Sequence, residues 1–248
     1  MSYEFSGVDN FLRNFYLHNY DGYVFFAKPL LEAHKQNGRE GIYLPFGVDT
    51  AVFSPREKMD RYACEVSYVG NDIKGTERTM RYLYPAVEFD FALYGNWDWV
   101  TPRYRFRIWK NRALRESFPP YKEIFRDISR GKIPQEDVPA LYSSSGVNLN
   151  CTLQSCVDWD VITLRTYEVL ACKGFLITDK VPSAESTLKD KVVFTDGDAD
   201  LTEKIKYYLT HDEERLAIAE RGYNHVIAYE SIESRAKTLM QYLRDIVV

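Results

Sequence analysis

The sequence has few cysteines, and their arrangement is not that of a metal site or a disulfide framework. Only four of the 248 residues are cysteine, and no two of them form a Cys-x-x-Cys pair. No histidine stands at zinc-ligand spacing from them. A chain of this length can bury a sizeable core without disulfides, so we expect reduced and mostly buried thiols.

Positive charge is also scarce, and long hydrophobic runs are missing. Lysine and arginine number 32 against 36 aspartate and glutamate residues, which gives a formal net charge of -4. Binding to a nucleic-acid backbone needs a local excess of cations, so nucleic acid is not an expected partner. No stretch approaches the roughly 18 apolar residues of a membrane span, and the N-terminus has no signal-peptide pattern. We therefore expect a cytoplasmic protein without a transmembrane segment.

Short apolar runs alternate with amphipathic stretches, which predicts βαβ units around a largely parallel sheet. The predicted fold class is α/β, doubly wound, with Thr163 and Asp200 as helix N-caps. The predicted strands are Tyr23–Phe26, Gly41–Leu44, Glu65–Val69, Phe89–Tyr94, Gly146–Asn150, Gly174–Thr178 and Val192–Phe194. The predicted helices are Pro29–Asn37, Thr76–Leu83, Asp137–Ser143, Leu164–Cys172 and Asp200–Leu209, with two more within Asp212–Val247.

Two segments interrupt this alternation of predicted strands and helices. Leu44 to Pro55 is punctuated by proline and glycine directly after a predicted strand, which indicates a hinge between two units. Trp97 to Arg130 has no clear period and contains a run of arginines and two adjacent prolines, so we expect an inserted excursion or a helical detour there.

Two motifs carry a resemblance to a known class of enzymes. The segment from Pro45 to Pro55 resembles the "PxGVDxxxFxP" connection between the acceptor and donor domains of GT-B glycosyltransferases. The segment from Leu164 to Asp179 is similar to the "RTFEALACGAFLLTD" signature of CgeB-like glycosyltransferases, which belong to the same clan as family 4 enzymes. Further pieces follow in the family's order: Val66–Asn71, Phe91–Trp97 and Lys132–Asn150.

The resemblance implies a Rossmann-like GT-B donor domain with a short N-terminal remnant of a second domain. Residues 1–48 would be the tail or a reduced form of an acceptor-type domain plus the hinge. Residues 49–230 would form the nucleotide-sugar-binding domain, and residues 231–248 a C-terminal helix that packs back towards the N-terminal part. A complete GT-B enzyme has two such domains, so other domains of a longer polypeptide are possible partners.

The predicted donor site centres on the helix that follows Thr163. The first turn of a helix presents unpaired N–H groups and the positive end of its dipole, which favour a diphosphate. Arg165 in that turn can add a bidentate contact to phosphate oxygens. The resemblance implies that Glu168 accepts hydrogen bonds from the ribose hydroxyls, and Thr166 lies between these two residues in the signature.

Other predicted site residues come from the loops after the strands. Gly70, Asn71 and Lys74 follow the first predicted strand of the donor domain, where backbone amides and an ammonium group could approach the phosphates. A tight turn with a solvated lysine explains the same pattern equally well. Lys132 begins the loop that the resemblance implies faces the base.

Asp160 is the predicted catalytic carboxylate beside Arg165. It stands eight residues before Glu168, as the first acid does in the family's E-x7-E pattern, although the family has glutamate there. The resemblance implies a position near the donor sugar, whereas a plain loop residue is equally compatible with the pattern. Asp158 and Asp160 also fit the DxD pattern with which GT-A enzymes hold a divalent metal.

These observations predict a glycosyltransferase of the hexosyl or deoxyhexosyl type in glycan biosynthesis. It would move a sugar from a nucleoside diphosphate to a hydroxyl of a glycan, lipid-linked or protein acceptor. No cofactor or metal is expected, and a UDP-sugar is favoured over a GDP-sugar as donor. One alternative is a non-catalytic module that binds nucleotide sugars within a larger protein. A second alternative is a metal-dependent GT-A-like transferase that uses Asp158 and Asp160.

Overall fold

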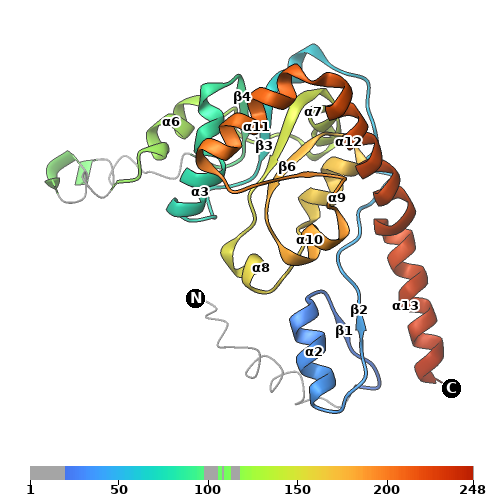
Figure 1. Ribbon diagram of the computed structural model, residues 1–248. Helices are drawn as coiled ribbons and strands as arrows, with labels where there is room; N and C mark the ends of the chain where they lie inside the picture. The colour runs from blue at the N-terminus through green and yellow to red at the C-terminus, as the bar shows by residue number, and fades with distance from the viewer. Residues whose placement is uncertain (1–19, 98–105, 108, 113–117, 248) are drawn as a thin grey trace.

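A five-stranded parallel sheet lies at the centre of the chain (Figure 1), with the strand order β4-β3-β5-β6-β7. The computed structural model describes residues 20–97, 106–107, 109–112 and 118–247. The order reverses at β3, because the chain goes first to β4 on one side and then to β5 on the other. The doubly wound prediction is therefore confirmed. The strands are β3 (Cys64–Val69), β4 (Phe91–Tyr94), β5 (Ser145–Asn150), β6 (Leu176–Asp179) and β7 (Val193–Thr195).

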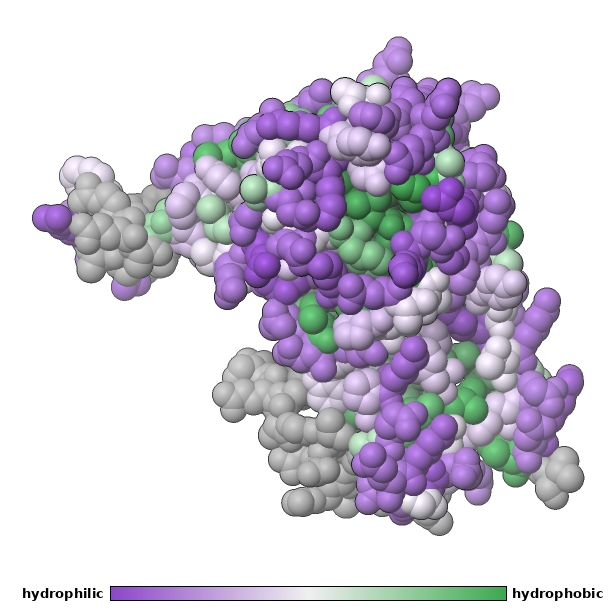
Figure 2. Space-filling model, in the orientation of Figure 1, coloured by the Kyte–Doolittle hydropathy of each residue, from purple (hydrophilic) through white to green (hydrophobic). Residues whose placement is uncertain are grey.

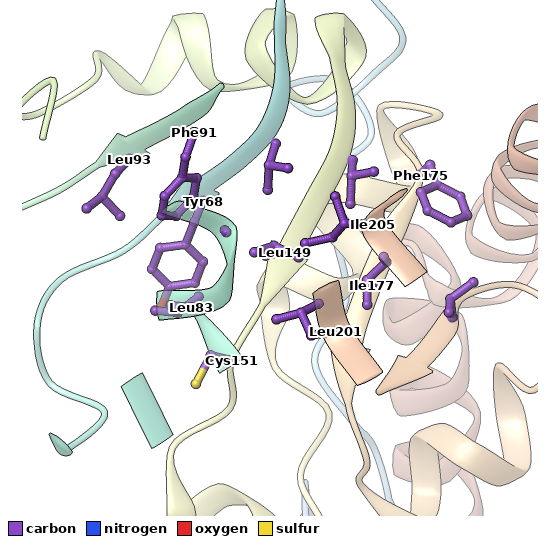
Figure 3. Packing of buried hydrophobic residues seen from close by; sticks show 14 of the residues in the cluster. Tyr68, Leu83, Phe91, Leu93, Leu149, Cys151, Phe175, Ile177, Leu201 and Ile205 are labelled. Atoms are coloured by element: carbon purple, nitrogen blue, oxygen red, sulfur yellow. The ribbon is translucent and has the colours of Figure 1, made fainter. Parts of the chain in front are cut away.

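Helices cover both faces of this sheet. Leu201 and Ile205 of α11 face Leu149 of β5 and Ile177 of β6 in a core that also takes side chains from α6 and α12 (Figure 3). A second core on the opposite face includes side chains of α7, α9 and α10. The helices are α3 (Thr76–Tyr82), α6 (Tyr121–Ile128), α7 (Val138–Ser144), α8 (Gln154–Asp158), α9 (Leu164–Ala171), α10 (Pro182–Thr187), α11 (Asp198–Thr210), α12 (Asp212–His225) and α13 (Ile232–Val247). Shorter helical turns are η1 (Asp60–Tyr62), η2 (Tyr84–Glu88), η3 (Gln135–Asp137) and η4 (Val226–Glu230).

A small βαβ unit precedes the segment predicted as a hinge, residues 44–55, which is called the hinge below. It consists of β1 (Val24–Phe25), α2 (Lys28–Gln36) and β2 (Ile42–Tyr43), and its two strands are parallel. His34 of α2 is fully buried, with Nε2 3.1 Å from the carbonyl oxygen of Glu40. A helix and two short strands bury little apolar surface by themselves. The unit is therefore stabilised by its contacts with the rest of the chain.

Two connections join the βαβ unit to the larger unit, and they run side by side. Val48 of the hinge donates its N–H to the carbonyl of Glu230, and Ile232 donates to the carbonyl of Val48. From there α13 extends along the βαβ unit, where the hydroxyl of Tyr242 accepts a hydrogen bond of 3.0 Å from the N–H of Tyr23. The hinge and the C-terminal crossing thus hold each other in place.

The face of the molecule shown in Figure 2 is mostly hydrophilic, with separate hydrophobic patches on both units. No helix in the described part of the chain has the length and apolar character needed to cross a membrane.

Most predicted elements are present, and the differences concern short or polar segments. All seven predicted strands exist with shifted ends. The N-cap prediction for Asp200 is wrong, because α11 begins at Asp198 and Asp200 lies in its first turn, where its carboxylate accepts from the N–H of Asp196. Within the Trp97–Arg130 excursion α6 is a regular helix, whereas residues 98–105, 108 and 113–117 lie outside the described residues. The sequence prediction also missed α8 and α10, which have five and six residues.

Candidate functional site

The candidate site lies where the strand order reverses, at the carboxyl ends of β3 and β5. Loops that leave two adjacent parallel strands in opposite directions leave a crevice between them, and ligands of doubly wound folds bind there. Gly70 directly follows β3, Asn150 ends β5, and the N-terminus of α9 lies beside both. The fold therefore brings together residues that the sequence places in three separate segments.

Two glycines let the loops after β3 and β4 approach each other closely. Gly95 has a φ of +131°, and a Cβ atom there would lie 2.1 Å from the carbonyl oxygen of Gly70. A Cβ atom on Gly70 would lie 2.9 Å from Nη2 of Arg165. A side chain at Gly95 would require movement of the backbone, and a side chain at Gly70 would require movement of the Arg165 guanidinium and of the Tyr68 ring, whose hydroxyl would lie 2.8 Å from the Cβ atom.

Arg165 is held in the first turn of α9 by contacts on two sides. Its Nη1 donates a hydrogen bond of 2.9 Å to Oδ1 of Asn150. Its guanidinium carbon lies 4.8 Å from the ring centroid of Tyr68, so the group is also stacked on an aromatic face. The Tyr68 hydroxyl beneath it is buried without a hydrogen bond to the described residues, and burial raises the pKa of Tyr68 to about 12. The orientation of the guanidinium is therefore fixed by the protein.

Lys74 places a second positive charge in the same crevice. Burial lowers the pKa of Lys74 below its usual value, and the charge of Arg165 lowers it further. Among the described residues neither Arg165 nor Lys74 has a carboxylate in ion-pair contact, and two such cations favour the binding of an anion that bridges them.

Glu168 lies one turn further along α9 from Arg165. Its side chain is half-buried, and its carboxylate makes no hydrogen bond or ion pair with the described residues. Burial raises the pKa of Glu168, and the charge of Arg165 offsets part of this effect. A half-buried carboxylate without a partner reduces stability, so it indicates a group reserved for a ligand.

A buried ion pair supports the loop after β5. Asp179 at the end of β6 pairs with Arg78 of α3, and the N–H and hydroxyl of Thr152 donate to the Asp179 carboxylate at 3.1 and 2.9 Å. Arg78 also donates to the carbonyl of Thr152 at 2.6 Å. This network fixes the chain just after Asn150, so it positions the residues of the crevice without facing it.

The other predicted donor-binding residues occupy varied positions. Thr163 is the N-cap residue of α9, as predicted, and its hydroxyl donates a long hydrogen bond of 3.5 Å to Asn150 rather than capping the helix. Thr166 is buried in the first turn. Asn71 is exposed, and its Oδ1 accepts from the N–H of Asn96 at 2.8 Å. Lys132 is exposed in the loop after Gly131, whose carbonyl accepts from the N–H of Gly95, so this loop lies at the same end of the sheet.

The two aspartates of the DxD pattern have separate partners. Both oxygens of Asp160 accept hydrogen bonds from Ser183, at 2.6 Å from its N–H and 2.7 Å from its hydroxyl, so this carboxylate holds the first turn of α10. Asp158 accepts a hydrogen bond of 2.7 Å from Gln154 within α8. The described residues contain no group of three or more metal-ligating side chains. Asp160 therefore holds Ser183 in position, and the described residues do not form a metal site around Asp158 and Asp160.

The sequence analysis missed Asn150, Tyr68, Arg78 and Asp179. Asn150 and Asp179 each end a parallel strand, and polar residues at such ends converge on one edge of the sheet, so their positions carried a usable signal. Arg78 and Tyr68 had none, because their roles depend on which loops meet in space.

The crevice thus combines two cations with a carboxylate that has no hydrogen-bond or ion-pair partner among the described residues. The chain matches the glycosyl transferase-like family over residues 78–241, and it belongs to this family. The match includes Arg78, Asn150, Arg165 and Glu168, whereas Gly70 and Lys74 precede it. A search of curated proteins found no significant match.

Solved structures of glycosyltransferases share this fold. Sucrose-phosphate synthase from Thermosynechococcus elongatus aligns with a TM-score of 0.62 and 17% identity, over 96% of this chain and 61% of that protein. Anabaena HepE in complex with UDP-glucose aligns with a TM-score of 0.64 and 11% identity, over 98% and 70% of the two chains. The β-glucosyltransferase of phage T4 aligns with a TM-score of 0.56 and 18% identity, over 88% and 62%. The chain thus has a Rossmann-like fold shared with GT-B glycosyltransferases, and it spans less than two thirds of the length of the synthase.

Proposed function

We propose that the crevice binds the nucleoside-diphosphate part of an activated sugar, and that the protein transfers this sugar to a hydroxyl of an acceptor. The observation that carries the proposal is the Arg165 guanidinium fixed by Asn150 and Tyr68 at the reversal of strand order, with Glu168 on the same helix. Lys74 is near enough for the charge of Arg165 to lower its pKa. Membership of the glycosyl transferase-like family supports it. The signature around Arg165 and Glu168 supports assignment to the CgeB-like branch.

Each part of the donor has a group that matches its chemistry. The diphosphate lies between Arg165, Lys74 and the first turn of α9, where N–H groups and the helix dipole add to the positive charge. The Glu168 carboxylate accepts hydrogen bonds from the two ribose hydroxyls. The base lies against the loop at Lys132. Uridine is favoured, because the Anabaena neighbour of similar fold is described in complex with UDP-glucose.

The chain's residues act on the leaving group. During transfer the bond between the anomeric carbon and the diphosphate oxygen breaks, and its electron pair stays on the diphosphate. The acceptor oxygen bonds to the anomeric carbon, and its proton passes to an oxygen of the departing diphosphate or to water. Arg165 and Lys74 stabilise the charge that develops on the diphosphate, so the proposal needs no divalent metal. Arg165 is the proposed catalytic residue, and Asp160 positions the loop before α9 through Ser183.

Binding and transfer are tested in sequence. The purified chain is titrated with UDP, GDP, TDP and ADP, and UDP-sugars are then incubated with hydroxyl acceptors while release of UDP is measured. Acceptor-dependent release of UDP is the expected result. Tight binding of UDP without transfer to glycan, lipid-linked or protein acceptors would support the alternative of a non-catalytic binding module. Absence of binding to every nucleotide would contradict the proposal.

A further inference from the structure

An apolar pocket lies between the βαβ unit and the larger unit. Its volume is about 150 Å³. Phe26, Leu30 and Phe46 line it from the βαβ unit and the hinge, and Cys156, Trp159 and Val161 line it from α8 and the loop that follows. Among the residues that the structure describes, the lining has no charged side chain, and Ser155 supplies its one hydroxyl.

The pocket is next to the proposed donor site along the chain and in space. The wall formed by α8 and the following loop belongs to the segment that leaves β5 at Asn150 and enters α9 before Arg165, and these two side chains are hydrogen-bonded to each other. Cys156 is close enough to Lys74 to affect the pKa of that lysine. A molecule held in the pocket would therefore lie beside the segment that joins Asn150 to Arg165.

Two of the aromatic side chains that line the pocket, Phe26 and Phe46, are exposed to solvent. The rings of Phe26 and Phe46 stack with centroids 5.5 Å apart, and the two residues keep 44% and 40% of their surface exposed. Val161 and Leu30, on the inner side, are buried in the core shared by the two units. Exposed aromatic side chains around an uncharged cavity favour an apolar ligand, because polar groups placed there would lose their hydrogen bonds to water.

We propose that this pocket holds an apolar group of about the size of one ring or one isoprene unit, carried by the acceptor. This inference rests on the proposed function and specifies its acceptor class: a hydroxyl compound with an apolar portion. A cavity of about 150 Å³ lined by apolar side chains is large enough for benzene. The apolar group anchors the acceptor, so its hydroxyl is directed towards the sugar held at Lys74 and Arg165.

Cys156 provides a direct measurement of occupancy. It is partly exposed, whereas Cys151 and Cys172 are buried, and Cys64 is partly exposed at the opposite end of β3 and serves as an internal control. The rate of alkylation of each cysteine is followed by peptide mass mapping with phenyl β-glucoside, geranyl β-glucoside or methyl β-glucoside. At a ligand concentration of ten times Kd, mass action predicts a reaction at Cys156 about tenfold slower.

The expected result is protection of Cys156 by the phenyl or geranyl glucoside, no protection by the methyl glucoside, and an unchanged rate at Cys64. Stronger protection by the phenyl glucoside would indicate that the pocket prefers a ring, and stronger protection by the geranyl glucoside that it prefers a prenyl chain. Equal rates with all three compounds would overturn the proposal.

A filled-pocket variant gives a second readout. Ser155→Trp adds a large side chain at an exposed position of α8, so the fold should be retained. This variant should bind UDP as the wild type does but lose calorimetric binding of the protecting glucoside by at least about tenfold. Unchanged glucoside binding in Ser155→Trp would contradict the pocket assignment. If the wild type does not bind UDP but the glucoside still protects Cys156, the proposed function and the acceptor role of the pocket are contradicted. The apolar binding site itself would then still stand.

Discussion

Arg165 and Asn150 are hydrogen-bonded partners, with Nη1 2.9 Å from Oδ1, although they stand 15 positions apart in the sequence. The bond joins the end of β5 to the first turn of α9. Together with the ring of Tyr68 it fixes the guanidinium in one orientation. A group that is already oriented loses little conformational entropy when an anion binds, so this arrangement favours tight binding of a diphosphate.

The first prediction concerns the geometry of Arg165. Arg165→Lys keeps the positive charge but loses the planar fork that bonds Asn150 and stacks on Tyr68. We expect the Kd for UDP to rise by about tenfold or more, measured by calorimetry. Arg130→Lys, at a partly exposed arginine paired with Asp90, is the matched control and should bind UDP normally. An unchanged Kd in Arg165→Lys would place the diphosphate elsewhere.

The second prediction concerns the titration of Lys74. Its pKa is lowered by burial and by Arg165, so it loses its proton at a lower pH than an exposed lysine does. The affinity for UDP should therefore fall as the pH rises through this lowered pKa. Lys74→Arg keeps its charge at these pH values and should remove the fall. If the wild type and Lys74→Arg show the same pH profile, Lys74 does not contact the nucleotide.

The third prediction separates stability from binding at Glu168. Because burial raises its pKa in the folded state, the folded protein holds a proton that the unfolded chain has released, and stability falls as the pH rises through this window. Glu168→Gln removes the buried charge, so the ligand-free variant should have a higher Tm than the wild type at pH 7. Its Kd for UDP should be about tenfold weaker, because hydrogen bonds to a charged acceptor are lost.

Thermal melts with and without UDP test both parts of this prediction. Glu220→Gln, which removes an exposed carboxylate paired with Lys173, is the control and should change neither quantity appreciably. Two results would contradict the proposal that the Glu168 carboxylate is kept free for a ligand. One is a lower Tm of ligand-free Glu168→Gln than of the wild type. The other is an increase in Tm on addition of UDP that is the same in both proteins.

The fourth prediction concerns the close approach of two loops. Gly95→Ala places a Cβ atom 2.1 Å from the carbonyl oxygen of Gly70, at a φ of +131°. Gly75→Ala is the control, because Gly75 also has a positive φ, of +84°, but a Cβ atom there meets nothing within 4 Å. We expect Gly95→Ala to lower the free energy of unfolding by more than about 2 kcal/mol, and Gly75→Ala by about 1 kcal/mol. Denaturant titrations measure both values. If the two variants lose similar amounts of unfolding free energy, the contact with the Gly70 carbonyl adds no cost beyond the backbone strain at positive φ.

The sheet could be predicted because its pattern is local. β4 and β6 are short runs of mostly apolar residues, and β3 and β5 carry apolar side chains at alternate positions, so the signal does not depend on the rest of the chain. The prediction failed where tertiary contacts decide the structure. The five residues of α8 are too few to show a helical period, and α11 begins at Asp198 because Gly197, with a φ of +83°, precedes it.

The site could be predicted only where a motif carried it. Arg165, Glu168 and Lys74 belong to segments that were recognisable in the sequence, and the fold brings Arg165 and Lys74 together. Asn150 was recognised only as the last residue of a strand, because its partner is 15 positions away. The catalytic role of Asp160 stays a prediction. Its two hydrogen bonds to Ser183 could not be predicted, because they depend on where α10 lies, which no local pattern shows.

Calorimetric titration of the chain with UDP in the presence of EDTA tests the central claim most directly, with wild type and Glu168→Ala compared side by side. The account predicts binding of UDP to the wild type without metal, and a Kd weaker by about ten- to a hundredfold in the variant. Binding that requires a divalent metal, or equal affinity in the two proteins, would contradict it.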